Sequence, residues 1–181
     1  VYKRQLYNGW LVSQGLFPYK DFLLGTNPLV CYFLAFLFNI GGVNWLLPRY
    51  VTVVFSLSII ALTYFLGRTQ SNSTVGVFAA ILLALDPVFF YYGRSIELEI
   101  YQGLIDYLAV SLLFFWSANL SKTKLSFVAL ILSVGFLFKA TSIPTFLAVL
   151  IYLFLIRRER EKSLYLLLVY AIIVMLALVP F

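Results

Sequence analysis

Residues 140–156 read ATSIPTFLAVLIYLFLI, and residues 163–181 read SLYLLLVYAIIVMLALVPF. Each run approaches the roughly 20 apolar residues that an α-helix needs to cross a bilayer. Neither run alternates between apolar and polar positions, which excludes the wall of a membrane β-barrel. The two runs therefore predict an all-α, polytopic membrane protein, in which transmembrane helices form a bundle.

The composition of the whole chain agrees with this class. Of its 181 residues, 63% are hydrophobic and 11% are charged, whereas a soluble domain has about 45–50% apolar and about 25% charged residues. Histidine is absent and Cys31 is the single cysteine, so the commonest metal ligand is missing and no intramolecular disulfide can form. We predict a packing role for Cys31, no metal site and no required cofactor; a divalent cation is left open, without any ligand spacing to support it.

The apolar segments divide the chain into a first loop, residues 1–43, and a transmembrane bundle, residues 44–181. In the loop, helical spacing of apolar residues predicts an amphipathic helix that lies on the membrane surface and ends at Gly15. A second segment, residues 28–40, is too short for a clear crossing and is either a short span or another surface helix. Six crossings follow, at residues 44–67, 75–92, 98–120, 125–138, 141–156 and 163–181, and we expect the last to continue into a longer protein.

The charges indicate an orientation. If the crossings alternate, Arg68, Lys122, Lys124 and the cluster at residues 157–162 all fall on one side of the membrane. Membrane proteins concentrate basic residues on the cytoplasmic side. This bias accounts for the net charge of +6, and we expect no nucleic-acid partner.

The opposite, external side then receives a small group of charges of both signs, namely Arg49, Arg94, Glu97, Glu99 and Lys139. Charges at a membrane boundary that are few and mixed in sign suggest a shared polar site. The alternative for each is an interfacial side chain that extends to the lipid headgroups.

Several motifs resemble those of C-type glycosyltransferases, and the closest match is to the dolichyl-phosphate-mannose protein mannosyltransferase and aminoarabinose transferase family. The matching segments, in order, are Gly15-Leu-Phe-Pro18-Tyr19-Lys20-Asp21-Phe22, Asn27-Pro28-Leu29, Pro48-Arg49-Tyr50, Gly93-Arg94-Ser-Ile-Glu97-Leu-Glu99 and Gly135-Phe-Leu-Phe-Lys139-Ala-Thr141. Each motif alone is weak, whereas their order and spacing together are moderately specific. The resemblance implies that residues 28–40 form an external helix at the membrane face.

The resemblance also implies an activity, the transfer of a sugar from a polyprenyl-phosphate donor to an acceptor on the external or lumenal face. Such a site must neutralise the donor phosphate and supply a carboxylate as general base. Arg49 and Lys139 are the better phosphate ligands, since neither has a neighbouring acid in the sequence, whereas Arg94 has Glu97 and Glu99 close by. Glu97, Glu99, Asp106, Tyr19 and Asn27 are candidates for the substrate cavity.

The resemblance places the principal catalytic acid at or upstream of Val1, and no acid stands at Val1 or Tyr2. We therefore expect either that the acid precedes the fragment or that the protein is an inactive relative. Asp21 is the only acid left in the loop, either as an acceptor or sugar contact or as a turn residue.

Two acids stand inside predicted crossings, where a carboxylate is costly unless it is hydrogen-bonded or paired with a cation. Asp86 precedes Pro87, an arrangement typical of a helix N-cap. Asp106 lies two helical turns beyond Glu99, with Gln102 between them. This stripe either lines the sugar cavity or bonds a helix that the fragment lacks.

A lipid-linked glycan flippase component or a transporter is the leading alternative to the transferase. A transporter is expected to place its polar residues near the bilayer midplane, whereas most polar residues here fall at one face. We expect membrane lipids and the donor as partners, with the acceptor (protein, lipid or glycan) undetermined. The expected location is the plasma membrane of a bacterium or archaeon, or the endoplasmic reticulum of a eukaryote.

Overall fold

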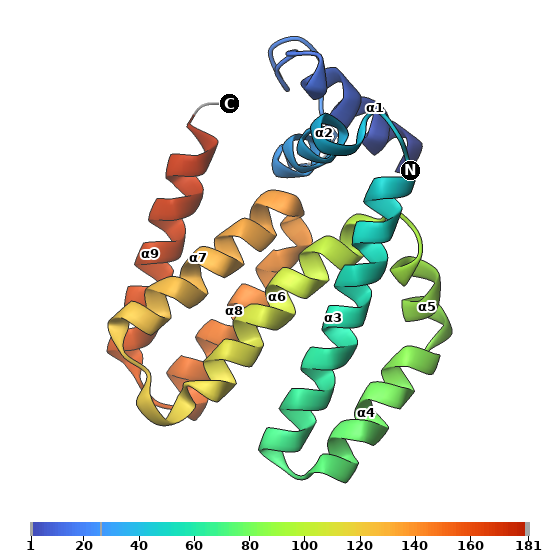
Figure 1. The fold of residues 1–181 in the computed structure, drawn as a ribbon. Helices are drawn as coiled ribbons and strands as arrows, with labels where there is room; N and C mark the ends of the chain where they lie inside the picture. The colour runs from blue at the N-terminus through green and yellow to red at the C-terminus, as the bar shows by residue number, and fades with distance from the viewer. Residues whose placement is uncertain (1, 26, 180–181) are drawn as a thin grey trace.

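The computed structural model describes residues 2–25 and 27–179, and 81% of the chain is helical, with no strand in the described part. The helices are α1 (Tyr2–Ser13), α2 (Leu29–Gly41), α3 (Leu46–Gln70), α4 (Ser73–Leu85), α5 (Pro87–Gly93), α6 (Leu98–Phe115), α7 (Lys122–Phe138), α8 (Ile143–Ile151) and α9 (Arg160–Leu178). Short turns of other helix types at Ser117–Asn119, Ala140–Ser142 and Tyr152–Ile156 complete the series. The predicted class, a helical membrane bundle, is confirmed (Figure 1).

Three helices, α3, α6 and α9, are each long and apolar enough to cross a membrane, and α4 with α5 would make a fourth as a bent pair. The helix α7 has 17 residues, and the apolar segment Ala140–Ile156 is shorter than a standard span. In Figure 1 these segments run alternately up and down between the same two ends of the bundle. The count of six crossings stays a prediction for the shorter segments.

The segment predicted to cross at residues 75–92 is two helices, α4 and α5, between which the chain bends by 70°. Pro87 occupies the first turn of α5, and a proline cannot continue the hydrogen-bond ladder of the preceding helix. The Asp86 carboxylate accepts a hydrogen bond of 2.6 Å from the Phe89 amide. The predicted N-cap is therefore confirmed, and it marks the break.

Replacing Asp86 by alanine is expected to destabilise the protein by about 0.5–2 kcal/mol, since the Phe89 amide loses its acceptor. The measurement is the thermal unfolding midpoint of the purified protein in detergent. Asp86→Asn is the matched control, because asparagine caps a helix as well as aspartate does. An equal loss of stability in both variants would contradict the capping role.

The helices α3 and α4 pack together through two glycines. A Cβ added to Gly67 would lie 2.7 Å from Gly76 Cα, and one added to Gly76 would lie 2.5 Å from the Tyr64 carbonyl oxygen. Small residues allow membrane helices to approach closely. The α3–α4 hairpin therefore depends on both positions having no side chain.

The end of α3, the start of α7 and the connection into α9 lie at the lower end of the bundle in Figure 1, and these parts of the chain carry the basic residues that predicted the cytoplasmic side. There the Arg157 guanidinium donates to the Ser117 carbonyl at 2.6 Å and ties the loop after α8 to the loop after α6. Glu159 pairs with Lys162 at 3.0 Å. Alternation of the helices thus places these residues at one end, as the sequence indicates.

The helices α1 and α2 lie together at the opposite end, beside the start of α3 (Figure 1). Buried residues of α2, among them Val30 and Leu34, form one cluster with Leu98 and Tyr101 of α6 and with Phe138 of α7. Cys31 belongs to the same cluster and has no exposed surface, which confirms its packing role. The segment 28–40 therefore forms a helix that packs on the end of the bundle, where the external site is expected.

Candidate functional site

The turn between α5 and α6, residues 94–97, is anchored to α3. The Ser56 hydroxyl donates to the Gly93 carbonyl at 3.0 Å, and a Cβ at Gly93 would lie only 2.9 Å from this hydroxyl oxygen. Within the turn, the side chain of Ile96 is buried. This close approach holds Arg94 and Glu97 at the same end of the bundle as Arg49.

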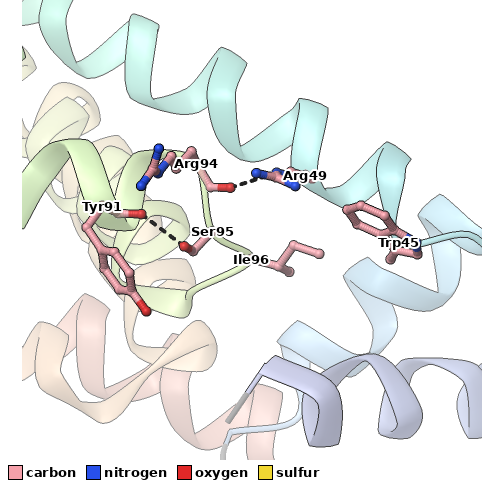
Figure 2. A pocket seen from close by; sticks show the side chains of 6 residues that line it. All are labelled: Trp45, Arg49, Tyr91, Arg94, Ser95 and Ile96. Atoms are coloured by element: carbon pink, nitrogen blue, oxygen red, sulfur yellow. Dashed lines mark hydrogen bonds between the residues drawn. The ribbon is translucent and has the colours of Figure 1, made fainter.

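Two predicted phosphate ligands, Arg49 and Arg94, line one cavity of about 260 Å³ at this turn (Figure 2). The Arg49 Nε donates to the Arg94 carbonyl at 3.0 Å, so the α3 side chain is braced against the turn. The Arg49 guanidinium also lies 5.6 Å from the ring of Trp45. The other lining residues are Trp45, Tyr91, Ser95 and Ile96.

Arg94 has a different partner from the one that its neighbours in the sequence suggest. Its guanidinium lies 4.8 Å from the centre of the Phe90 ring, one turn earlier in α5. The salt bridges found in the described part of the chain do not include Arg49 or Arg94. The cavity therefore presents two arginine side chains whose charge no carboxylate neutralises directly, an arrangement suited to an anion.

Lys139 has no acid close to it in the sequence, but the fold supplies one. Its ammonium group forms a salt bridge with the Glu99 carboxylate, across 40 positions of sequence. Both side chains remain partly exposed, at 31% and 43%. The tertiary fold thus joins the cation of one predicted motif to the acid of another.

Glu97 stands at the N-terminal boundary of α6 without a capping hydrogen bond of its own. Partial burial raises the pKa of its carboxyl group above the usual range, and the nearby Glu99 raises this pKa further. The residue holds a proton at a higher pH than an ordinary glutamate does.

An apolar cavity of about 540 Å³ lies between α3, α5 and α6, and sequence reasoning did not anticipate it. Its lining is mainly aliphatic and aromatic, and Glu99 and Asp86 contribute the carboxylates. The other lining residues are Ile59, Thr63, Leu83, Val88, Phe89, Tyr92, Ile100, Gly103 and Tyr107. The bend at Pro87, which sequence already marks, is the signal that could have indicated a gap beside α3.

Asp106 lies buried inside the bundle and bonds residues of this chain. Its carboxylate accepts hydrogen bonds from Ser142, from Thr145 at 3.1 Å and from Gln102 at 2.9 Å. Only 6% of Asp106 is exposed. The predicted polar stripe on α6 thus faces the segment after α7, and its partner is not a helix outside the described chain.

Of the first-loop candidates, Asp21 and Tyr19 lie in one turn, whereas Asn27 bonds to α7. The Asp21 carboxylate accepts from the Phe17 amide at 2.7 Å, which matches the alternative of a turn residue. Tyr19 adopts a φ of 65° in the same turn. The Asn27 amide donates to the Phe136 carbonyl and ties the loop to α7. The expected position of the principal acid, at or before Val1, lies outside the described residues.

One comparison with known proteins gives a match. A family model described as dolichyl-phosphate-mannose-protein mannosyltransferase matches residues 26–181 of the chain. No significant match was found to a curated protein or to a solved structure. The matched region contains both arginines of the cavity and the Lys139–Glu99 pair.

Proposed function

Because this chain belongs to the dolichyl-phosphate-mannose-protein mannosyltransferase family, we propose that it transfers a sugar from a polyprenyl-phosphate donor to an acceptor at the end of the bundle that carries Arg49, Arg94 and Lys139. The family makes the protein a membrane glycosyltransferase of the C type. Both its long apolar helices and this family indicate an integral membrane protein. The acceptor and the identity of the membrane remain predictions.

One observation carries the proposal. The Lys139–Glu99 pair lies at the apolar cavity between α3, α5 and α6, because Glu99 belongs to both the pair and the cavity lining. A polyprenyl-phosphate sugar needs an apolar surface for its chain and a cation for its phosphate at the end of that surface. We assign the prenyl chain to this cavity and the phosphate to the cations at this end of the bundle, with Lys139 on the cavity side of the α5–α6 turn and Arg49 and Arg94 on its other side.

The proposed reaction breaks the bond between the anomeric carbon and the phosphate oxygen of the donor. The acceptor hydroxyl oxygen attacks that carbon, its proton passes to a carboxylate, and the polyprenyl phosphate leaves with the bonding electrons. Cations near the leaving phosphate stabilise the charge that develops in the transition state. The reaction as proposed needs no cofactor, and we keep the principal base at or upstream of Val1.

In this proposal Glu99 competes with the donor phosphate for the Lys139 ammonium group. Opposite charges a few ångströms apart at a partly exposed site attract each other modestly. The donor phosphate is a diester with one negative charge, and in the proposal it displaces the carboxylate and leaves Glu99 free beside the reacting sugar.

The test is transfer of radiolabelled mannose from dolichyl-phosphate-mannose by the full-length protein in detergent. Arg49→Ala is expected to lower kcat/KM at least about tenfold, because a hydrogen bond to a charged group contributes about 1.5–3 kcal/mol. Arg68→Ala is the matched control, since Arg68 stands in the last turn of the same helix, at the opposite end. Equal activity of the Arg49 variant and the control would remove Arg49 from the phosphate site, and no transfer by the unmodified protein would favour the inactive relative or the transporter.

A further inference from the structure

The polar residues of α6 contact the segment that follows α7 in matching order along the two chains, a pattern that we call their register. Glu99 pairs with Lys139, Gln102 accepts a hydrogen bond of 2.6 Å from the Thr141 hydroxyl, and Asp106 accepts from Ser142 and Thr145. Residues 99, 102 and 106 lie on one helical face, since they are three and four positions apart. Three successive turns of α6 therefore hold three successive parts of the facing segment.

This facing segment has little regular structure of its own near Lys139. The helix α7 ends at Phe138, Lys139 has an extended backbone with φ −157° and ψ 134°, and a single turn of 3-10 helix spans Ala140–Ser142. Pro144 then stands in the first turn of α8 and cannot donate to a preceding turn. Two backbone hydrogen bonds hold the break locally, from the Lys139 amide to the Gly135 carbonyl at 3.0 Å and from the Ser142 amide to the Lys139 carbonyl at 3.1 Å, and the side chains of the segment add the contacts with α6.

Asp106 supplies the innermost of these contacts. Both carboxylate oxygens are used, one by Ser142 and the other by Gln102 and Thr145. Ser142 is fully buried. A carboxyl group in such surroundings is costly unless each oxygen is bonded, so the arrangement admits little displacement.

Gly135 shows how closely the parts fit. A Cβ at this position of α7 would overlap Oδ1 of Asp106 and would lie 2.9 Å from the Ser142 hydroxyl oxygen. The absence of a side chain on α7 is what admits the carboxylate between α7 and the break. Gly135, which belongs to the same motif as Lys139, thus leaves the space that the Asp106 carboxylate occupies.

From this register we infer that Asp106 is a positioning residue: it fixes the break after α7 through Ser142 and Thr145 and so sets where the Lys139 ammonium meets the donor phosphate. The inference rests on the proposed function, in which Lys139 binds that phosphate. Asp106 itself touches no reacting atom. Its contribution passes through three residues of backbone, from Ser142 to Lys139, and through the parallel Gln102–Thr141 contact.

The experiment measures the Kd of dolichyl phosphate for the full-length protein in detergent, so that no acceptor is needed. Ser142→Ala and Asp106→Asn are each expected to raise this Kd by about tenfold, within the range over which residues that do not touch a ligand modulate its binding. Ser111→Ala is the matched control, because Ser111 is also fully buried and bonds only the Tyr107 carbonyl of its own helix. Each variant is also combined with Lys139→Ala, and its thermal unfolding midpoint is recorded.

A positioning role predicts that Ser142→Ala and Asp106→Asn have no further effect on the Kd once Lys139 is alanine. The same loss of affinity with and without Lys139 would overturn the inference and indicate a general packing role. An unchanged Kd in both variants, with Lys139→Ala still weakening binding, would also overturn it while the proposed function stands. An unchanged Kd in Lys139→Ala itself would remove the proposed phosphate site. Should Asp106→Asn fail to fold, Ser142→Ala decides, since it leaves the carboxylate bonded to Gln102 and Thr145.

Discussion

Lys139→Ala is expected to raise the Kd of dolichyl phosphate by about 10- to 150-fold, the equivalent of a charged hydrogen bond of about 1.5–3 kcal/mol. The variant loses the ammonium group and leaves the Glu99 carboxylate without its partner. An unpaired carboxylate repels the phosphate, so the two effects add in the same direction. The measurement is equilibrium binding of dolichyl phosphate to the full-length protein in detergent.

Lys124→Ala is the matched control for this prediction. Lys124 lies in the first turn of α7, at the opposite end of the same helix, and donates to the Asn119 carbonyl at 2.8 Å. The control removes an equal charge and is expected to leave the Kd unchanged. A similar loss of affinity in both variants would show that the Lys139 effect reflects total charge rather than a site.

Glu99→Gln is expected to change binding in the opposite sense. Glutamine keeps the size of the side chain but releases the Lys139 ammonium from a partly exposed ion pair, which is worth about 0.2–1 kcal/mol. The Kd should therefore fall by roughly 1.4- to 5-fold. Weaker binding in Glu99→Gln would mean that the carboxylate helps to hold the donor and does not compete with it.

Gly76→Ala is expected to destabilise the protein by about 1–3 kcal/mol, because the added methyl group meets backbone atoms of α3. The new Cβ would lie 2.5 Å from the Tyr64 carbonyl oxygen and 3.0 Å from the Arg68 amide nitrogen. Backbone atoms cannot rotate away as a flexible side chain can, so α3 and α4 must separate. The readout is the thermal unfolding midpoint in detergent.

Gly103→Ala makes the same chemical change in α6, and nothing lies within 4 Å of its added Cβ. In open space the substitution removes the unfavourable helix propensity of glycine, so it should stabilise the protein by up to about 1 kcal/mol. The same replacement thus has opposite expected signs at two helical glycines. A loss of stability at both positions would contradict the packing argument.

Much of the fold could be predicted because the signals are local. The N-cap at Asp86 follows from one aspartate before one proline, and the separation of Arg68, Lys124 and Arg157 from Arg49 and Lys139 follows from counting crossings. The size of the bend at the same Asp86–Pro87 step, 70°, does not follow from these two residues, because it depends on how α4 and α5 pack against α3 and α6.

The site could be predicted only in part. Counting alternate crossings predicts that the five mixed charges fall at one end of the bundle, and the structure brings them to that end. They are Arg49, Arg94, Glu97, Glu99 and Lys139. Their partners could not be read, since Arg94 has two acids close in sequence yet lies over Phe90, whereas Lys139 has none nearby and pairs with Glu99. Spacing along a chain gives the face of a helix but not the neighbour that this face meets.

The sequence by itself determined that the chain is a helical membrane protein, which end carries the mixed charges, and which family it resembles. These conclusions depend on hydrophobic runs, charge bias and short motifs, all of which act over one or two helices. The tertiary structure alone decided that Glu99, Gln102 and Asp106 face the break after α7 and that an apolar cavity adjoins Glu99. The reason is physical: ion pairs and buried hydrogen bonds act over a few ångströms, and only the packing of α6 against α7 and α8 brings positions 40 residues apart within that range.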